Sequence, residues 1–121
     1  MVYHVENCPC KVFVNGATTA LGAGAGIIII TPERIWLEHS FRLNFRTFNN
    51  EAEYKALLAG LRAVLGMGAW DVEIYSDSRL VVNQVQGNFE ARDSRMKAYL
   101  QAVKEIMNKF GMAKVAQVGC T

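Results

Sequence analysis

The chain has 121 residues and a mass of 13.4 kDa, which is the size of one domain. Hydrophobic residues make up 51% and charged residues 20%, which excludes a disordered chain and predicts a packed core. No apolar run approaches the roughly 20 residues of a membrane helix. Residues 1–6 lack the basic start and apolar core of a signal peptide. We therefore expect an intracellular protein, nuclear or cytoplasmic, that is not secreted and has no membrane partner.

The cysteines do not form a recognisable framework. Cys8 and Cys10 are separated only by Pro9, and Cys120 is the only distant thiol. An odd number of cysteines does not suit a disulfide scaffold, and the spacing differs from that of common zinc knuckles. We expect free thiols.

The net charge is +2, but its distribution is uneven. Residues 1–78 carry six basic and eight acidic side chains, whereas residues 79–121 carry seven basic and three acidic ones. Carboxylates that hold cations, followed by basic groups that contact phosphates, are typical of nucleic-acid enzymes. A basic, solvated helix face gives the same pattern, so both interpretations stay open.

Three strands are predicted in the first third of the chain. Residues 11–14 are β-branched or aromatic, and Asn15-Gly16 after them indicates a two-residue hairpin turn. Residues 25–31 predict a second strand, whose four consecutive isoleucines indicate burial on both faces. Residues 35–43 alternate as a third strand, which gives an antiparallel meander.

The hydrophobic period then becomes helical, with apolar residues recurring between residues 54 and 65. Asn50 and Glu53 have the spacing of a capping box, and Gly66 and Gly68 are expected to end this helix. The remaining predicted elements are a strand at 72–75, a short helix at 78–85 ended by Gly87, a long helix at 94–110 capped by Asp93, and a strand at 113–118.

This element order brings three polar residues together. A right-handed crossover would make the fourth strand parallel to the first and place Asn15 beside Asp77, with Glu53 nearby in the first turn of the helix. Two carboxylates aimed at one point are tolerated around a divalent cation, and oxygen ligands favour Mg²⁺ or Mn²⁺. Each residue has a second interpretation: Glu53 closes the capping box, Asp77 together with Ser78 caps the next helix, and Asn15 belongs only to a turn.

Three motifs in this order resemble ribonuclease H domains. Residues 12–17, Val-Phe-Val-Asn-Gly-Ala, resemble the first-strand motif, which in the family ends in Asp-Gly. Residues 49–57 resemble the first-helix start with its paired asparagines and acidic residue, and residues 76–82 resemble the fourth-strand Asp motif. The register is most similar to domains of plant retroelement-derived, reverse transcriptase-associated sequences.

The resemblance spans roughly residues 11–118 and implies a fold. We expect an α/β, ribonuclease H-like fold with a mixed five-stranded sheet, flanked by helices. An antiparallel meander and parallel strands would make up this sheet. Residues 1–10 would form an N-terminal extension and residues 11–121 the domain, incomplete at its C-terminus because the family's last helix is absent.

The resemblance also implies a chemistry, namely metal-dependent endonucleolytic hydrolysis of the RNA strand of RNA–DNA hybrids. In the family, four carboxylates hold two Mg²⁺ ions, for which Mn²⁺ can substitute. The matching catalytic and metal-binding positions are Glu53, Asp77 and Asn15. The positions matching nucleic-acid contacts are Gly16, Asn49, Asn50, Ser78 and Arg79.

Two departures from the family pattern affect this expectation. Asn15 is neutral where the family has an aspartate that bridges both ions, and the chain ends at Thr121, before the fourth carboxylate. We therefore expect at most one weakly held ion and impaired cleavage. The uncovered sheet would favour pairing with a second copy. The alternatives are a catalytically inactive nucleic-acid-binding module and a retroelement remnant.

Overall fold

The computed structural model describes residues 9–19, 22–43 and 49–118. Five strands and three helices are formed by these residues. In chain order they are β1 (Cys10–Thr19), β2 (Gly22–Ile30), β3 (Trp36–Leu43), α1 (Asn49–Gly66), β4 (Asp71–Ser76), α2 (Arg79–Gln86), α3 (Ser94–Met107) and β5 (Met112–Gln117).

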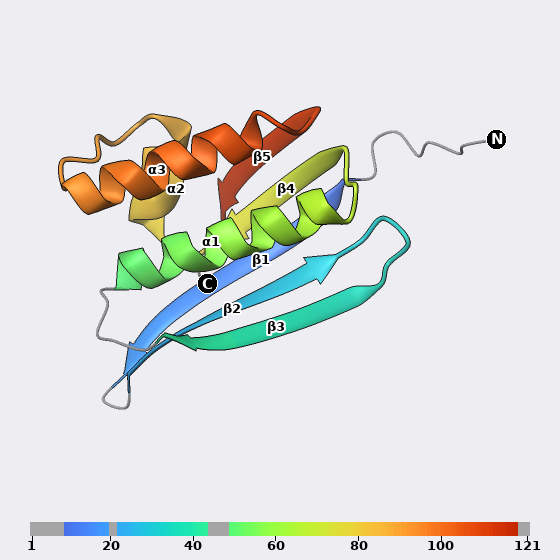
Figure 1. The fold of residues 1–121 in the computed structure, drawn as a ribbon, viewed down its shortest axis with the longest axis horizontal. Coiled ribbons are helices and arrows are strands. Elements are labelled where there is room, and N and C mark those ends of the chain that lie inside the picture. Colours follow the sequence, from blue (N-terminus) through green and yellow to red (C-terminus); the bar gives the residue numbers. More distant parts are fainter. Residues whose placement is uncertain (1–8, 20–21, 44–48, 119–121) are drawn as a thin grey trace.

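The strands form one mixed sheet in the order β3-β2-β1-β4-β5 (Figure 1). β1, β2 and β3 pair in antiparallel fashion, whereas β4 lies parallel to β1 and β5 lies parallel to β4. The predicted meander and the predicted parallel crossover through α1 are therefore confirmed. β1 occupies the centre of the sheet, although it is the first strand in the chain.

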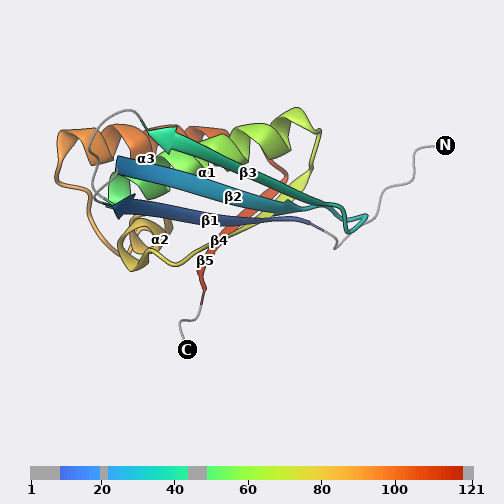
Figure 2. The ribbon, with the colours of Figure 1, turned by 90° about the horizontal axis from the view of Figure 1, so that it is seen from below.

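α1 and α3 lie on the same face of the sheet (Figure 2). α1 packs across β1 and β2, and the approach is tight at Gly60, where an added Cβ would lie 2.8 Å from Val12 Cγ1. Glycine therefore sets the spacing between α1 and the central strand. α3 packs beside α1, and α2 contacts both of these helices and β5.

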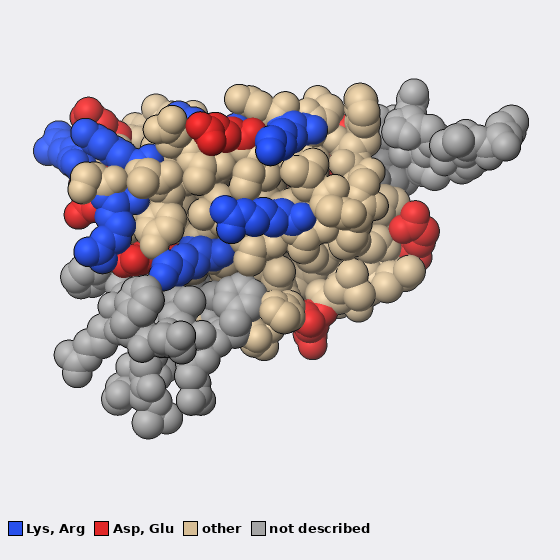
Figure 3. Space-filling view, in the orientation of Figure 1, with Lys and Arg blue, Asp and Glu red and all other residues tan. Residues whose placement is uncertain are grey.

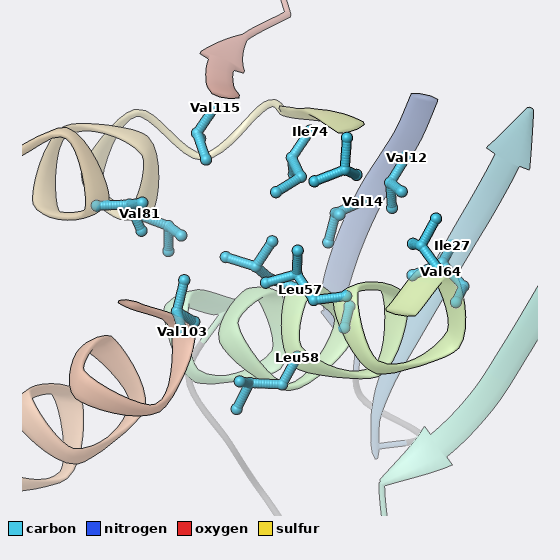
Figure 4. Close-up of a cluster of buried hydrophobic side chains, with 14 of the residues drawn as sticks. Val12, Val14, Ile27, Leu57, Leu58, Val64, Ile74, Val81, Val103 and Val115 are labelled. Atoms are coloured by element: carbon cyan, nitrogen blue, oxygen red, sulfur yellow. The ribbon is translucent and has the colours of Figure 1, made fainter. Parts of the chain in front are cut away.

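The core lies between the sheet and these helices (Figure 4). Alternate residues of the strands point into it, as the buried Val12 and Val14 of β1 illustrate. On the opposite face, Phe13 and Tyr75 are half-buried and stack with their ring centroids 5.1 Å apart. Pairing of this second face with another copy of the chain stays a prediction, as does the domain boundary at residue 11.

Two predictions about the strands are wrong. Asn15 and Gly16 do not form a turn, because β1 continues through them and pairs them with Gly26 and Ala25 of β2. The β-branched threonines that end β1 favour an extended backbone, and the pairing continues as far as Thr19 and Gly22. The isoleucines of β2 are not buried on both faces: Ile27 and Ile29 are buried and their neighbours only half-buried, since both long helices cover one face.

The helix ends agree largely with the sequence patterns. α1 ends at Gly66 as predicted, and α2 is capped by Ser78 and ends before Gly87, whose φ is +89°. α3 is capped by Asp93 as predicted but ends at Met107, three residues before the predicted end. The capping box is wrong, because α1 begins at Asn49 and Asn50 lies inside the helix.

Cys10 is a free thiol buried in the core, and burial together with the charge of Glu33 raises its pKa. Cys8 and Cys120 lie outside the described residues. Among the helices of the described segments, none combines the length and the apolar character that crossing a bilayer requires.

Candidate metal and nucleic-acid site

The carboxyl end of β4 lies against the middle of β1. Val14 and Ser76 are the last paired residues of the two parallel strands, so Asn15 and Asp77 are the next residues along this register. Val14 and Ser76 point into the core, whereas Asn15 and Asp77 are exposed. The register therefore brings Asn15 and Asp77 to one place in the sheet, although the first strand does not end there.

Glu53 reaches the same region from α1. Its side chain is only 2% exposed, and its Oε2 accepts a 2.8 Å hydrogen bond from the hydroxyl of Ser76. The Ser76 hydroxyl also accepts a 3.1 Å bond from the backbone N–H of Ser78. These bonds join the first turns of α1 to the end of β4 and the start of α2.

A second contact ties Asn50 to the same junction. The Ser78 hydroxyl accepts a 3.2 Å bond from the N–H of Val81, as an N-cap does, and donates a 3.3 Å bond to Asn50 Oδ1. Because Oδ1 is engaged, the amide N–H₂ of Asn50 is directed to other acceptors. The hydroxyl of Ser78 thus orients a residue predicted to contact nucleic acid.

The other predicted contact residues lie around this junction. Arg79 is exposed at the first position of α2, and its carbonyl accepts a 2.7 Å bond from the Asn83 side chain. Asn49 is the first residue of α1, and Gly16 follows Asn15 in β1. A hollow of about 300 Å³ adjoins Asn15, lined among others by Gly26 and Ser40.

The three predicted ligands are of the chemical type that a hard cation prefers. No three His, Cys, Asp or Glu side chains group closely enough to hold a metal within residues 9–19, 22–43 and 49–118. Glu53, Asp77 and Asn15 supply two carboxylates and one amide oxygen, which suits Mg²⁺ or Mn²⁺ better than zinc. Two negative charges balance one divalent ion, and a second ion would find no further carboxylate in this set.

A second buried carboxylate on α1 was not identified from the sequence. Glu51, also 2% exposed, accepts bonds from Arg95 Nη1 at 3.2 Å and from the Tyr99 hydroxyl at 3.0 Å. Tyr99 stacks on Tyr54, whose hydroxyl donates a 2.6 Å bond to Gln84. This network joins α1, α2 and α3.

The network also changes the acidity of its phenols. Burial, reinforced by the hydrogen bond to Glu51, raises the pKa of Tyr99 to about 12. Burial alone raises the pKa of Tyr54 to about 12. Only the helical spacing in the sequence indicates that these residues are buried, because Glu51 and Tyr54 lie on the stripe that continues to Leu58 and Leu61.

Basic side chains are spread over the helical face, most densely toward the start of α3 (Figure 3). Some of them border a hollow of about 710 Å³ between α3 and the segment that joins it to α2. Lys97 and Lys104 line this hollow together with Glu90 and Glu105, so its charge is mixed. The uneven charge of the sequence therefore does not form a purely basic groove there.

Comparison with known proteins decides the family. A family model described as "Reverse transcriptase-like" matches residues 13–118, which is most of the chain. The chain belongs to the ribonuclease H family. It is 35% identical over 65 residues to ribonuclease HI of Halobacterium salinarum, covering 54% of this chain and 33% of that protein. It is also 35% identical over 82 residues to a bifunctional protein of Mycobacterium tuberculosis, covering 66% of this chain and 22% of that protein.

Solved structures of the ribonuclease H family share the fold. The RNase H1 of H. salinarum superimposes with a TM-score of 0.82 at 26% identity, over 90% of this chain and 84% of that one. LC11-RNase H1, solved in complex with an RNA/DNA hybrid, superimposes with a TM-score of 0.79 at 24% identity, over 90% and 84% of the two chains. Ribonuclease H proteins generally depend on divalent metal ions.

The chain spans only a fifth to a third of the length of the curated relatives described above. Its membership of the ribonuclease H family and its fold follow from these comparisons.

Proposed function

We propose that this ribonuclease H domain binds RNA–DNA hybrids and hydrolyses their RNA strand in a metal-dependent reaction, with a rate lowered by Asn15. One observation carries the proposal. Glu53 of α1 is hydrogen-bonded to Ser76, at the end of the β1–β4 pairing, and Asn15 and Asp77 are the next residues of these two strands. The structural likeness to LC11-RNase H1, which was solved with an RNA/DNA hybrid bound, supports the same substrate class.

In this proposal the chain contributes ligands and a surface for the hybrid. Glu53, Asp77 and the Asn15 amide oxygen would hold one Mg²⁺ or Mn²⁺ ion. When bound, that ion would polarise a phosphate and lower the pKa of a water. Asn50, oriented by Ser78, would donate to the ribose hydroxyls or base edges of the minor groove, and Arg79 would contact phosphate.

The amide at position 15 is the reason for the reduced rate. Asparagine keeps the shape of aspartate, but it brings no negative charge and only one carbonyl oxygen. The affinity of an oxygen-ligated cation depends on the number of charged ligands. An enzyme with Asn15 is therefore expected to need more metal and to cleave more slowly than one with aspartate there.

The test is cleavage of a labelled RNA–DNA hybrid with Mg²⁺ or Mn²⁺, with binding read in the same samples. We expect hybrid binding that weakens steeply with salt, together with slow, metal-dependent release of RNA fragments. A Glu53→Gln variant should bind the hybrid and not cleave it, which excludes a contaminating nuclease. Duplex DNA of the same sequence serves as the substrate control.

The second candidate function is a binding module without catalysis, and the substitution at Asn15 favours it. Binding of the hybrid without cleavage at any metal concentration would contradict the enzymatic proposal and support this module. Absence of both binding and cleavage would contradict both functions and leave a remnant that keeps only the fold.

A further inference from the structure

We propose that Ser76 is a positioning residue for Glu53, fixing the direction in which this carboxylate presents its oxygens to a metal ion. The inference rests on the proposed function only in taking Glu53 as a metal ligand. Ser76 itself lies in the core, 2% exposed, and would touch neither metal nor nucleic acid.

The direction of the hydrogen bond is determined by the second bond to the same hydroxyl. The N–H of Ser78 donates to Ser76 Oγ at 3.1 Å, which occupies a lone pair of that oxygen. The single hydroxyl proton of Ser76 is then donated to Glu53 Oε2 at 2.8 Å. A hydroxyl held in this way fixes one carboxylate oxygen of Glu53 in place.

The backbone of Ser76 is fixed on both sides of β4. Ser76 pairs with Val14 of β1 and with Gln117 of β5, and its carbonyl accepts a 2.9 Å bond from the N–H of Val118. Glu53 lies on a different element, 23 residues earlier in the chain. The bond therefore holds the carboxylate of Glu53 at a fixed position relative to the centre of the sheet.

Such outer hydrogen bonds matter to metal sites because they orient the ligand. Loss of a partner of this kind typically weakens metal binding by about 10- to 100-fold. A buried serine that served only the stability of the fold would not change metal affinity at equal foldedness. Measuring metal affinity and stability together therefore distinguishes a positioning role of Ser76 from a purely structural one.

The experiment titrates Mn²⁺ alone into the full chain carrying Asn15→Asp, where the site has three carboxylates, and follows free Mn²⁺ by electron paramagnetic resonance. Four further changes are compared in that background: Ser76→Ala, Ser76→Cys, Ser76→Thr and Glu53→Gln. Thermal unfolding of each variant is recorded under the same conditions. Cysteine keeps the size of serine but is a weak donor, whereas threonine keeps the hydroxyl.

We expect Ser76→Ala and Ser76→Cys to weaken Mn²⁺ binding about tenfold, and Ser76→Thr to retain it. If alanine prevents folding, the cysteine and threonine variants make the same comparison at nearly constant volume. Unchanged Mn²⁺ affinity in the cysteine variant, with Glu53→Gln still abolishing binding, overturns the role of Ser76 and leaves the proposed function intact. Unchanged affinity in Glu53→Gln overturns both, since Ser76 would then have no ligand to position.

Discussion

The two sides of the N-terminal half of α1 each bury a glutamate, and they treat it differently. On the side facing α3, Glu51 accepts bonds from a guanidinium and a phenol, those of Arg95 and Tyr99. On the side facing the sheet, Glu53 accepts a bond from the neutral hydroxyl of Ser76, at the end of the strand that leads to Asp77. The two glutamates are equally buried and only two residues apart.

The difference shows how the partners of a buried acid indicate its task. A carboxylate paired with a cation and a phenol from a neighbouring helix serves to join helices. In the proposed function, the carboxylate oriented by the Ser76 hydroxyl, beside two exposed polar residues, instead holds a metal ion that comes from solution. Burial alone would have assigned the same role to both.

The largest expected effect concerns the phenols on the α3 side. Tyr54 and Tyr99 have a pKa near 12 in the folded chain, against 10.0 ordinarily. Between pH 10 and pH 12 the two phenols are ionised in the unfolded chain but still protonated in the folded chain. The free energy of unfolding is therefore highest below pH 10 and declines as the pH rises toward 12. For the fully buried Tyr54 the full loss is about 3 kcal/mol, of which about 2 kcal/mol is expected by pH 11.5. Urea unfolding at pH 9, 10 and 11.5 measures it.

The Tyr54→Phe variant provides the control for this alkaline loss, because its side chain has no proton to lose. Its stability at pH 9 should be lower, since the bond to Gln84 is gone, but its dependence on pH should be flatter. An equal slope in both proteins would contradict the assignment to Tyr54.

The next prediction compares the two buried glutamates directly, by their contributions to the free energy of unfolding. Glu51→Gln should lower the free energy of unfolding by about 2 kcal/mol, because the charge-assisted bonds from Arg95 and Tyr99 are weakened. Glu53→Gln should change it by less than about 1 kcal/mol, because the Ser76 hydroxyl can donate equally to an amide oxygen. Urea unfolding at neutral pH compares them, and equal losses would remove the distinction between the two sides.

A smaller effect concerns metal binding on the side of α1 that faces the sheet. Asn15→Asp should strengthen Mn²⁺ binding by at least about tenfold, because it adds a unit charge next to Asp77. Isothermal titration measures the affinity. Asn88→Asp adds the same charge at an exposed position of the α2–α3 connection and serves as the matched control. An equal gain in both variants would mean that only net charge matters.

The smallest effect tests the junction at Ser78. Ser78→Ala should cost about 1 kcal/mol of stability through loss of the α2 cap. It should also weaken hybrid binding, because Asn50 loses the hydroxyl that orients its amide. Ser78→Thr retains the hydroxyl and should restore both. Ser94→Ala, an exposed change at the first residue of α3, should alter neither stability nor binding.

Much of the fold could be predicted from the sequence because local patterns and topology agree. The helical stripe of α1, the caps Ser78 and Asp93, and Gly87 each determine an element or one of its ends. The right-handed crossover then placed β4 beside β1. The turn predicted at Asn15-Gly16 is wrong because pairing with β2 outweighs the local turn preference. The residues that pair with Asn15 and Gly16 are about ten positions away, so a short stretch of sequence does not reveal this pairing.

The candidate site could be predicted only in part. Element order and motif both point to Glu53 and Asp77, but neither predicts the hydrogen bond between Ser76 and Glu53, because that contact joins residues 23 positions apart. Glu51 was missed since an acid at the start of a helix has an ordinary local explanation. Its burial is determined by α3, whose position against α1 no sequence pattern gives.

The central position of β1 has a consequence for folding. β1 emerges first during synthesis and can pair with β2 at once, but its other edge must wait for β4, about sixty residues later in the chain. Contacts of such long range slow folding, because a large loop has to close before they form. The meander is therefore expected to assemble early with one edge of β1 still unpaired, and the pairing of β4 with that edge to bring Asn15 and Asp77 together.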